Sequence, residues 1–461
     1  MIFDNFSLTL DHHRRNRLGA KGIENGMKTE TAILGAALLT GCASFDAFQA
    51  GKFEAFPVAP DAPEAWAAAG VAGEAEEGDW LAGFNDPTMA ALVEEALENN
   101  YTLAAQLATL RAAAADAVAE RGNLLPFVNG SVSGGGNRAV FDNNFGNRIE
   151  DYSGTLGLGI NASWEADLWG RLSAGVDIAD ANTAIAKADL DAARLSVATQ
   201  TAIAWINLNA AIAQERVAED TLEARERITQ LTERRFARGL SSALDVRTAR
   251  SSLAGAEASI AARRQATGEA ARRLEVLLGR YPSAEINAPS TLPSLAPIER
   301  ASSPTLLLSR RPDIAAAEVR VIQAGLRAEQ ARLALFPSLN ITASLSTNST
   351  DDFSRAFDPA YIAAQAVGNL TQPLYAGGQL SARADAFIER AEISLANYAS
   401  AALTAWREVE DALAADMFLA IQEEAQARAL EEAAFAEELA ERQYQNGLVS
   451  IFNLIDSQTR R

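Results

Sequence analysis

The sequence has few of the side chains that enzymes use for chemistry. Its 461 residues include one cysteine, Cys42, and two histidines, His12 and His13, all near the N-terminus. Because no imidazole or thiol follows Cys42, histidine acid–base catalysis, thiol nucleophiles and most transition-metal sites are excluded from the rest of the chain. A carboxylate-based hydrolase stays conceivable, but no pair of Asp or Glu residues lies in a recognisable site. We therefore predict a protein that is not an enzyme and that binds neither a metal nor a cofactor.

Basic side chains are also scarce. The chain has 40 Lys and Arg residues against 60 Asp and Glu residues, which gives a formal net charge of −20. Such a chain repels phosphate instead of releasing counterions from it, so a nucleic-acid partner is excluded. Aromatic residues make up only 7% of the chain, and alanine is abundant, as is typical of long helices.

The apolar run near the N-terminus is short. Residues 32–39 are apolar, they follow Met27 and Lys28, and Leu-Thr-Gly leads from them into Cys42. A basic start, a short apolar core and small residues before the cut indicate a secretory signal that is too short to span a bilayer. The sequence Leu-Thr-Gly-Cys is similar to the bacterial lipobox, whose cysteine becomes the lipidated first residue of the mature protein. The alternative interpretation of Cys42 is a lone buried cysteine.

The N-terminal segments follow from this signal. We interpret residues 1–41 as an N-terminal extension plus a lipoprotein signal peptide, with Met27 as the true start. Ala43 stands where an Asp would retain a lipoprotein in the inner membrane, so sorting to the outer membrane is favoured. Residues 42–79 are rich in Ala, Pro, Gly and Glu, which predicts a lipid anchor followed by a linker to the body.

The rest of the chain repeats itself. The pentapeptide GRLSA at residues 170–174 recurs as GQLSA at residues 378–382, and the run at residues 234–250 recurs at residues 442–458. Both pairs share an offset of about 208 positions, which indicates an internal duplication. We predict a first repeat over residues 80–290 and a second over residues 291–461. Because the second copy stops before the counterpart of the last helical segment of the first, we expect a C-terminally truncated second repeat.

Each repeat begins with a helix and a β-hairpin. The first helix is expected from Asp86-Pro87 to about Arg121, and the second from Arg311-Pro312 to Phe336-Pro337. Polar and apolar residues then alternate with a period of two, which predicts strands of about 9–11 residues, long enough to cross a bilayer when tilted. The expected strands lie around residues 128–133, 155–163, 339–346 and 362–373, with a Gly- and Asn-rich loop at 134–147 and a polar loop at 348–355. A soluble, half-buried hairpin is the alternative.

A very long helical stretch follows each hairpin. Residues 172–238 and 380–446 are rich in Ala, Glu, Arg and Leu and contain no proline. At about 1.5 Å per residue, each reaches on the order of 100 Å and needs lateral partners, as in a coiled coil. Gly239 and Gly447 mark the points where the chain reverses. A returning helix is expected over residues 240–279.

Four membrane-length strands cannot close a barrel by themselves. Open sheet edges in lipid leave backbone groups without partners, at several kcal/mol each. Other copies of the chain must therefore complete the sheet, and three copies supply twelve strands, an even number within the range of outer-membrane barrels. The strand spacing itself does not fix the number three.

Several motifs make the chain similar to a known family. They are SWEADLWGR at residues 163–171, RRPDIAAAE at 310–318, FPS at 336–338 and EVEDAL at 408–413. Over about residues 38–461 the chain resembles the outer-membrane efflux proteins of the TolC type, in particular the lipoprotein (NodT) branch of RND efflux systems. The resemblance implies an α+β membrane protein: a homotrimer with a twelve-stranded outer-membrane β-barrel that continues into a long periplasmic α-helical coiled-coil barrel. It implies a passive exit duct for small molecules such as drugs or toxic compounds, with a periplasmic adaptor and an inner-membrane RND pump as partners.

The resemblance also assigns residues. It places the turns with Gly239-Leu240 and Gly447-Leu448 at the periplasmic tips, where the family meets its adaptor; a plain hairpin turn is the compatible alternative. It places Asp456 on a pore-lining helix near the closed aperture, where symmetry gives a ring of carboxylates. A solvated surface Asp is the alternative there.

The aperture carries two further assignments. Phe452 matches an apolar constriction. Many relatives carry an Arg three residues past the aperture Asp. Thr459 stands at that position here, so an Asp–Arg latch of that form is not expected, although Arg460 is adjacent.

Two groups of charged residues receive a structural interpretation. Trp164, Glu165, Asp167 and Arg171 lie where a strand meets a long helix, where charges cap a helix and Trp anchors at an interface. Arg311-Pro312-Asp313 is interpreted as a helix start. For the whole chain, the alternative to a channel is a lipid-anchored periplasmic coiled-coil adaptor or scaffold, which accounts for the helices and Cys42 but not for four alternating strands.

Overall fold

The computed structural model describes residues 63, 65–68, 80–142, 148–295, 303–350 and 352–460. The predictions for His12, His13, Met27, Cys42 and Ala43, and for most of the linker at 42–79, concern positions outside the described residues. All described residues belong to one compact unit, Pro57–Arg461.

Long helices and four strands make up this unit. Its α-helices are α4 (Pro87–Asn99), α5 (Tyr101–Gly122), α6 (Arg171–Ala237), α7 (Ala243–Leu277), α8 (Pro304–Arg310), α9 (Pro312–Leu333), α10 (Gln379–Gln445) and α11 (Ile451–Arg460). Its strands are β1 (Phe127–Asp142), β2 (Arg148–Ala166), β3 (Ser338–Thr350) and β4 (Ala363–Thr371). Short 3-10 turns are η1 (Ala82–Phe84), η2 (Phe353–Phe357) and η3 (Pro359–Tyr361).

The strands form one antiparallel sheet in the order β1-β2-β3-β4. The register pairs Phe127 with Ser163 between β1 and β2, and Ser338 with Thr371 between β3 and β4. Between the two hairpins, Ala166 pairs with Leu339. Within the chain, β1 and β4 are therefore the edge strands, each with one hydrogen-bonding side that no other described strand takes up.

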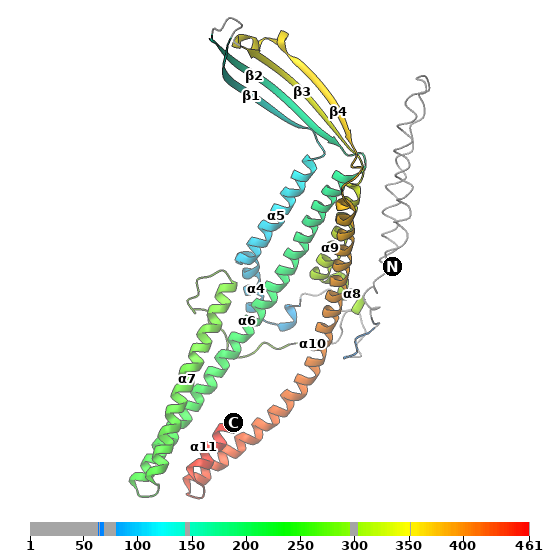
Figure 1. The fold of residues 1–461 in the computed structure, drawn as a ribbon. Helices are drawn as coiled ribbons and strands as arrows, with labels where there is room; N and C mark the ends of the chain where they lie inside the picture. Colours follow the sequence, from blue (N-terminus) through cyan, green and yellow to red (C-terminus); the bar gives the residue numbers. More distant parts are fainter. Residues whose placement is uncertain are drawn as a thin grey trace. The chain divides into compact units, whose positions relative to one another are not determined.

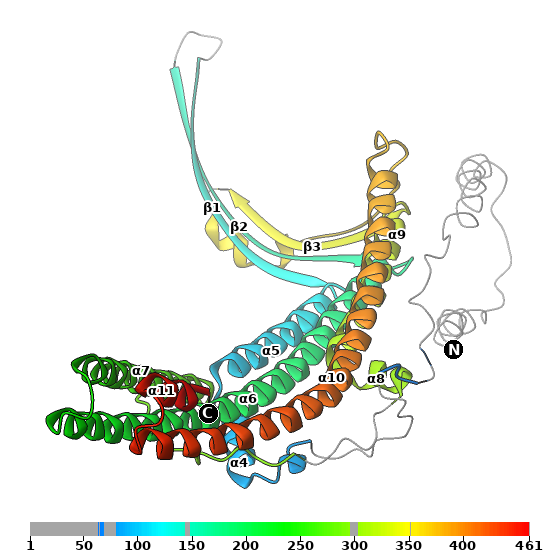
Figure 2. The same cartoon turned by 90° about the horizontal axis from the view of Figure 1, so that it is seen from below.

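The helices match in pairs. Helices α6 and α10 have 67 residues each, and α10 begins 208 positions after α6. Helices α5 and α9 have 22 residues each. The strands lead into α6 and α10 at one end of the helices, and both long helices reverse at the far end, into α7 and α11 (Figures 1 and 2).

Two predicted elements were wrong, and one helix was not predicted. The single helix expected from Asp86 to Arg121 is two helices, because Asn100 is extended and its side chain accepts hydrogen bonds from the N–H groups of Thr102 and Leu103, which starts a new helix. The loop expected at 134–147 is largely strand, since β1 has 16 residues and β2 has 19. Continuous pairing with the partner strand outweighs the low strand propensity of Gly and Asn there. Helix α8, with Ser303 as its N-cap, was not predicted.

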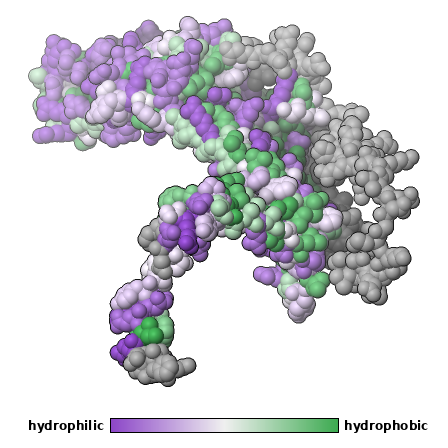
Figure 3. Space-filling view, turned by 90° about the horizontal axis from the view of Figure 1, so that it is seen from above, coloured by the Kyte–Doolittle hydropathy of each residue, from purple (hydrophilic) through white to green (hydrophobic). Residues whose placement is uncertain are grey.

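The main core joins α4, α6 and α7. Met89, Trp205, Leu208 and Leu274 are at most 1% exposed and pack together. The Trp205 indole N–H donates a 2.7 Å hydrogen bond to Asp86, the residue that also caps α4. Hydrophilic surface dominates the far ends of the helices, and hydrophobic surface gathers in the middle of the view (Figure 3). Among the described residues, no helix is both long and apolar enough to cross a membrane.

Candidate functional site

The turn between α6 and α7 is the first of two similar tips. Gly239 has φ +72°, a left-handed conformation that only glycine adopts without strain. Its N–H donates to the Phe236 carbonyl, and the Leu240 N–H donates to the Arg235 carbonyl, which ends α6. The Leu240 side chain is 63% exposed at the turn.

The start of α7 closes this tip. The Asp245 N–H donates to the Ser242 hydroxyl over 3.1 Å, and the Ser242 N–H donates to the Asp245 carboxylate over 2.8 Å. Ser241 donates to the same carboxylate. These bonds together lower the pKa of Asp245, although partial burial opposes them. Such a reciprocal capping box holds the tip rigidly between its two helices.

The turn between α10 and α11 has the same geometry. Gly447 has φ +76°, and its N–H donates to the Tyr444 carbonyl. The Leu448 N–H donates to the Gln443 carbonyl, and the Leu448 side chain is 74% exposed. The four residues predicted for the tips therefore form two matching turns, each with a left-handed glycine and an exposed leucine.

Side chains that sequence reasoning missed hold the two tips together. The Arg235 guanidinium donates to the carbonyls of Tyr444 and Gln445, at 3.1 and 2.8 Å, and lies over the Tyr444 ring. The Tyr444 and Thr232 hydroxyls share a 2.9 Å hydrogen bond. Ile228 and Leu454 pack in the same small core. The repeated run at residues 234–250 was visible in the sequence, but it did not indicate which of its arginines contacts the other tip.

Helix α11 carries the predicted aperture residues. Phe452 is 53% exposed. The Asp456 carboxylate accepts a 3.0 Å hydrogen bond from Arg460, one turn further on, and both side chains are largely exposed. An Asp–Arg pair is therefore present on α11, but its arginine is Arg460, four residues past Asp456, and position 459 is a threonine.

Thr459 has another partner, on α6. The buried Arg225 guanidinium donates to Gln458 over 2.7 Å and to the Thr459 hydroxyl over 3.1 Å. This bond joins α11 to the first long helix, and no sequence motif indicated it.

The junction of strand and helix is structural, as interpreted from the sequence. The Asp167 carboxylate accepts from the N–H groups of Leu172 and Ser173 and from the Ser173 hydroxyl, at the N-terminus of α6. Burial alone would raise the pKa of Asp167, but these hydrogen bonds outweigh it and lower the pKa. Arg171 pairs with Glu165 at 2.7 Å.

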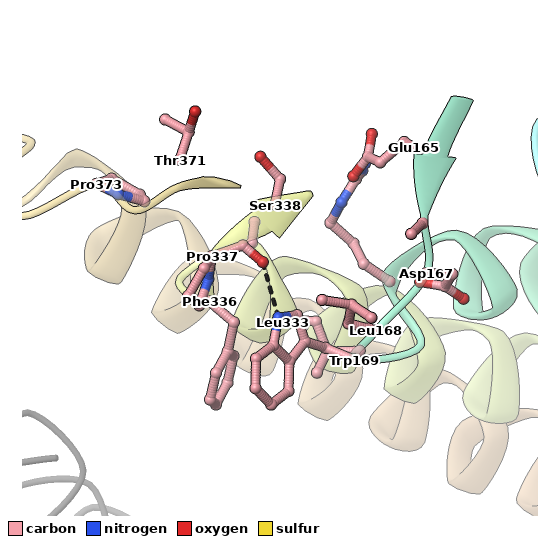
Figure 4. A pocket seen from close by; sticks show the side chains of 13 residues that line it. Glu165, Asp167, Leu168, Trp169, Leu333, Phe336, Pro337, Ser338, Thr371 and Pro373 are labelled. Carbon is pink, nitrogen blue, oxygen red and sulfur yellow. Dashed lines mark hydrogen bonds and ion pairs between the residues drawn. The ribbon is translucent and has the colours of Figure 1, made fainter. Parts of the chain in front are cut away.

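An open cleft of about 340 Å³ lies at this junction. Trp169 and Phe336 lie side by side in its lining, with ring centroids 5.3 Å apart, and the Trp169 indole N–H donates to the Pro337 carbonyl (Figure 4). Trp169 thereby joins the end of β2 to the start of β3. The remaining lining residues come from the helix cap, the strand ends and the end of α9, so the cleft lies at a joint between these elements.

The motif at residues 408–413 makes two different contacts. Glu408 pairs with Arg311 at 2.7 Å, and Arg311 also pairs with Asp313 at the start of α9. Glu410 accepts hydrogen bonds from the backbone N–H groups of Ala67 and Ala68, at 2.7 and 2.8 Å.

The linker is therefore attached to the body at this point. Trp66 is 3% exposed and directly precedes Ala67 and Ala68, whose N–H groups donate hydrogen bonds to Glu410. A carboxylate with two backbone donors and a neighbouring buried Trp form a clamp on α10, which the sequence did not predict.

Comparisons with known proteins identify the class of protein. The profile of the outer membrane efflux protein family matches residues 92–280 and 304–460. The chain is 30% identical over 384 residues to the pyoverdine export outer membrane protein OpmQ of Pseudomonas aeruginosa, covering 82% of this chain and 80% of that protein. It is 29% identical over 388 residues to the cation efflux system protein CusC of Escherichia coli O157:H7, covering 83% and 82%. The structure of the outer-membrane channel OprN matches with a TM-score of 0.74 and 27% identity, over 87% of this chain and 92% of that one.

Fold and relatives together define a class of channel proteins rather than enzymes. The chain belongs to the outer membrane efflux protein family. It is an outer-membrane component of an efflux system.

Proposed function

We propose that three copies of this chain close their sheets into one twelve-stranded outer-membrane barrel, and that their helices continue it as a coiled-coil barrel in the periplasm. The assembly is a passive exit duct for small molecules such as drugs or toxic compounds. The observation that carries this proposal is the four-stranded sheet with two open edges, since a sheet in lipid must have no edge.

The chain supplies its part of this assembly as two tandem repeats, at residues 80–290 and 291–461. The equal lengths of α6 and α10, and of α5 and α9, support this division. Each repeat gives one hairpin to the barrel and one long helix to the periplasmic tube. A scaffold without a barrel leaves the four-stranded sheet without a role.

The test of the channel is its assembly in the membrane. The full chain, expressed in a Gram-negative host, should fractionate with the outer membrane and migrate as a trimer that heating converts to monomer. Purified trimer should conduct ions across a planar lipid bilayer. A washable, non-trimeric protein would overturn the proposal.

The tips are proposed as the contact surface for a periplasmic adaptor that links the channel to an inner-membrane RND pump. Leu240 and Leu448 are exposed at matching turns, which suits them to a groove on a partner. Changing both to Asp should abolish capture of the adaptor in pull-down while the trimer persists. Val276→Asp is the control, an exposed apolar residue at the other end of α7. Unchanged capture by the tip variant would rule this surface out.

The aperture and the anchor complete the proposal. Phe452 and Asp456 lie on α11 and, in a trimer, form rings at the periplasmic entrance. Cys42 carries lipid that anchors the chain to the outer membrane. Labelling with a palmitate analogue should mark the wild type and not Cys42→Ser, and labelling that survives the substitution would contradict the anchor.

A further inference from the structure

Both edges of the sheet are exposed, and their pairing partner follows from the symmetry of the chain. All of β4 and nearly all of β1 are exposed, whereas much of β2 is half-buried. β1 and β4 therefore each have a free edge along which a further strand can pair.

Two constant offsets relate the hairpins. Phe127 pairs with Ser163 in the first hairpin, and Ser338 pairs with Thr371 in the second. Position 338 is 211 after 127, and position 371 is 208 after 163. The offset from β1 to β3 is thus 211, and the offset from β2 to β4 is 208.

A pair of hydrogen bonds supports both offsets independently. The Trp164 indole donates to the Leu124 carbonyl, and the Gln372 amide donates to the Leu335 carbonyl, both over 3.0 Å. Gln372 stands 208 after Trp164, and Leu335 stands 211 after Leu124. Each hairpin is therefore attached in the same way to the turn that follows its preceding helix.

The contact between β2 and β3 joins the two hairpins and serves as the template for a contact between copies. Its register pairs Thr155 with Thr350, so the two positions sum to 505. Adding 208 to a position of β2 gives the equivalent position of β4, and subtracting 211 from a position of β3 gives the equivalent position of β1. The sum of paired positions therefore changes from 505 by plus 208 and minus 211, which gives 502 for a contact between β4 and β1.

We propose that β4 pairs antiparallel with β1 of a second copy in the register where the two positions sum to 502. Thr371 then lies opposite Ser131 of the second copy, and Ala363 lies opposite Ala139. All nine residues of β4 fall within the length of β1. The inference rests on the proposed function, because it names the contact that closes the barrel.

The exposed apolar residues agree with this register. Leu370, 59% exposed, falls opposite Val132, 76% exposed. A shift by one residue would instead place the apolar face of one sheet beside the polar face of the next. The register therefore covers apolar surface that the single chain leaves open.

Cysteine pairs test the register, because the chain has a single natural cysteine, Cys42. One variant carries Gln365→Cys with Asn137→Cys, and a second carries Ala366→Cys with Gly136→Cys; both pairs sum to 502. Consecutive pairs cover both antiparallel spacings, about 4.5 and 5.5 Å between Cα atoms, within the range of a disulfide. A Cβ at Gly136 meets open space.

The control keeps Gln365→Cys and moves the partner to Ser133→Cys. This displaces the second cysteine by four residues, about 13 Å along the strand, on the same face. Each single-cysteine variant shows what Cys42 contributes. Heat-modifiable migration before oxidation establishes that every variant assembles.

After mild oxidation in the outer membrane, the two matched pairs should lose their monomer band to covalent dimer and trimer, which reductant restores. The control and the single variants should stay monomeric on denaturing gels. Cross-linking of the control in place of the matched pairs would overturn the register while the trimer stands. Assembled trimers that cross-link at no pair would overturn the β4–β1 contact. If neither the variants nor the wild type assemble into trimers, the proposed function is overturned as well.

Discussion

Arg225 joins the first long helix, α6, to α11 through hydrogen bonds, beside the apolar packing of Ile228 against α11. The residue is 6% exposed, and its guanidinium donates to Gln458 and Thr459. Hydrogen bonds from a charged donor contribute about 1.5–3 kcal/mol each. We expect Arg225→Met to release α11, and hydrogen exchange of the α11 backbone amides should become faster.

Arg227 provides the matched control. It is an arginine of the same helix whose side chain is 70% exposed and pairs with Glu223 on that helix. Exposed pairs of this kind contribute little, so Arg227→Met should leave exchange in α11 unchanged. If the α11 amides exchange equally fast in both variants, Arg225 does not hold α11 to α6.

Glu275 fixes the chain that follows α7. It is 2% exposed and accepts hydrogen bonds from the N–H groups of Ala284, Glu285 and Ile286. Burial alone would raise the pKa of Glu275, but the backbone donors outweigh it and hold the pKa below its ordinary value of 4.5. This stabilisation is therefore present above pH 4.5 and is lost as the pH falls through the lower, folded-state pKa.

Glu275→Gln should lower the free energy of unfolding by about 1–3 kcal/mol at pH 7, because one oxygen becomes a donor facing backbone N–H groups. It should also reduce the loss of stability in acid. Thermal unfolding of the detergent-solubilised protein at pH 7 and pH 4 measures both effects. Glu269→Gln, an exposed residue of the same helix, is the control. A variant as stable as the wild type at pH 7 would show that Glu275 is dispensable.

At the scale of elements, the linker and α10 are joined by the clamp of Glu410 and Trp66. The amides of Ala67 and Ala68 are held by one carboxylate at 2.7 and 2.8 Å. Glu410→Ala should speed hydrogen exchange in a peptide that covers these two amides, because they then bond only to water. Asp411→Asn is the control, since Asp411 is 66% exposed and pairs with Arg407 on its own helix. No change in exchange would mean that Trp66 alone holds the linker.

The elements themselves were largely predictable. The long helices were expected at 172–238 and 380–446 and are found within one residue of those limits, because 67 residues without proline and with glycine at the end leave few alternatives. The break at Asn100 and the length of β1 were not predictable. Both depend on partners distant in sequence: Asn100 donates to the Leu277 carbonyl, and β1 is held residue by residue along β2.

At the scale of the whole molecule, the sheet has two faces with different expected surroundings. Val132 and Ser133 are neighbours on β1 and point to opposite faces. In a barrel the apolar face meets lipid, where a Lys destabilises by about 2–4 kcal/mol at the midplane and by 0–1 kcal/mol near the interfaces. Val132→Lys should reduce the yield of heat-modifiable trimer in the outer membrane, and Ser133→Lys should not. The reverse order would mean that the sheet faces the other way.

The sequence by itself determined the number of strands, the two long helices, the glycine turns and the family, because periodicity, glycine placement and the duplication are local or repeated signals. The tertiary structure decided which side chains connect these elements. Arg225, Arg235, Glu275 and Glu410 were indistinguishable from other charged residues until the fold placed a carbonyl, an amide or a hydroxyl within about 3 Å of each. A hydrogen bond between residues distant in the chain depends on the packing of whole helices, and no local pattern encodes that packing.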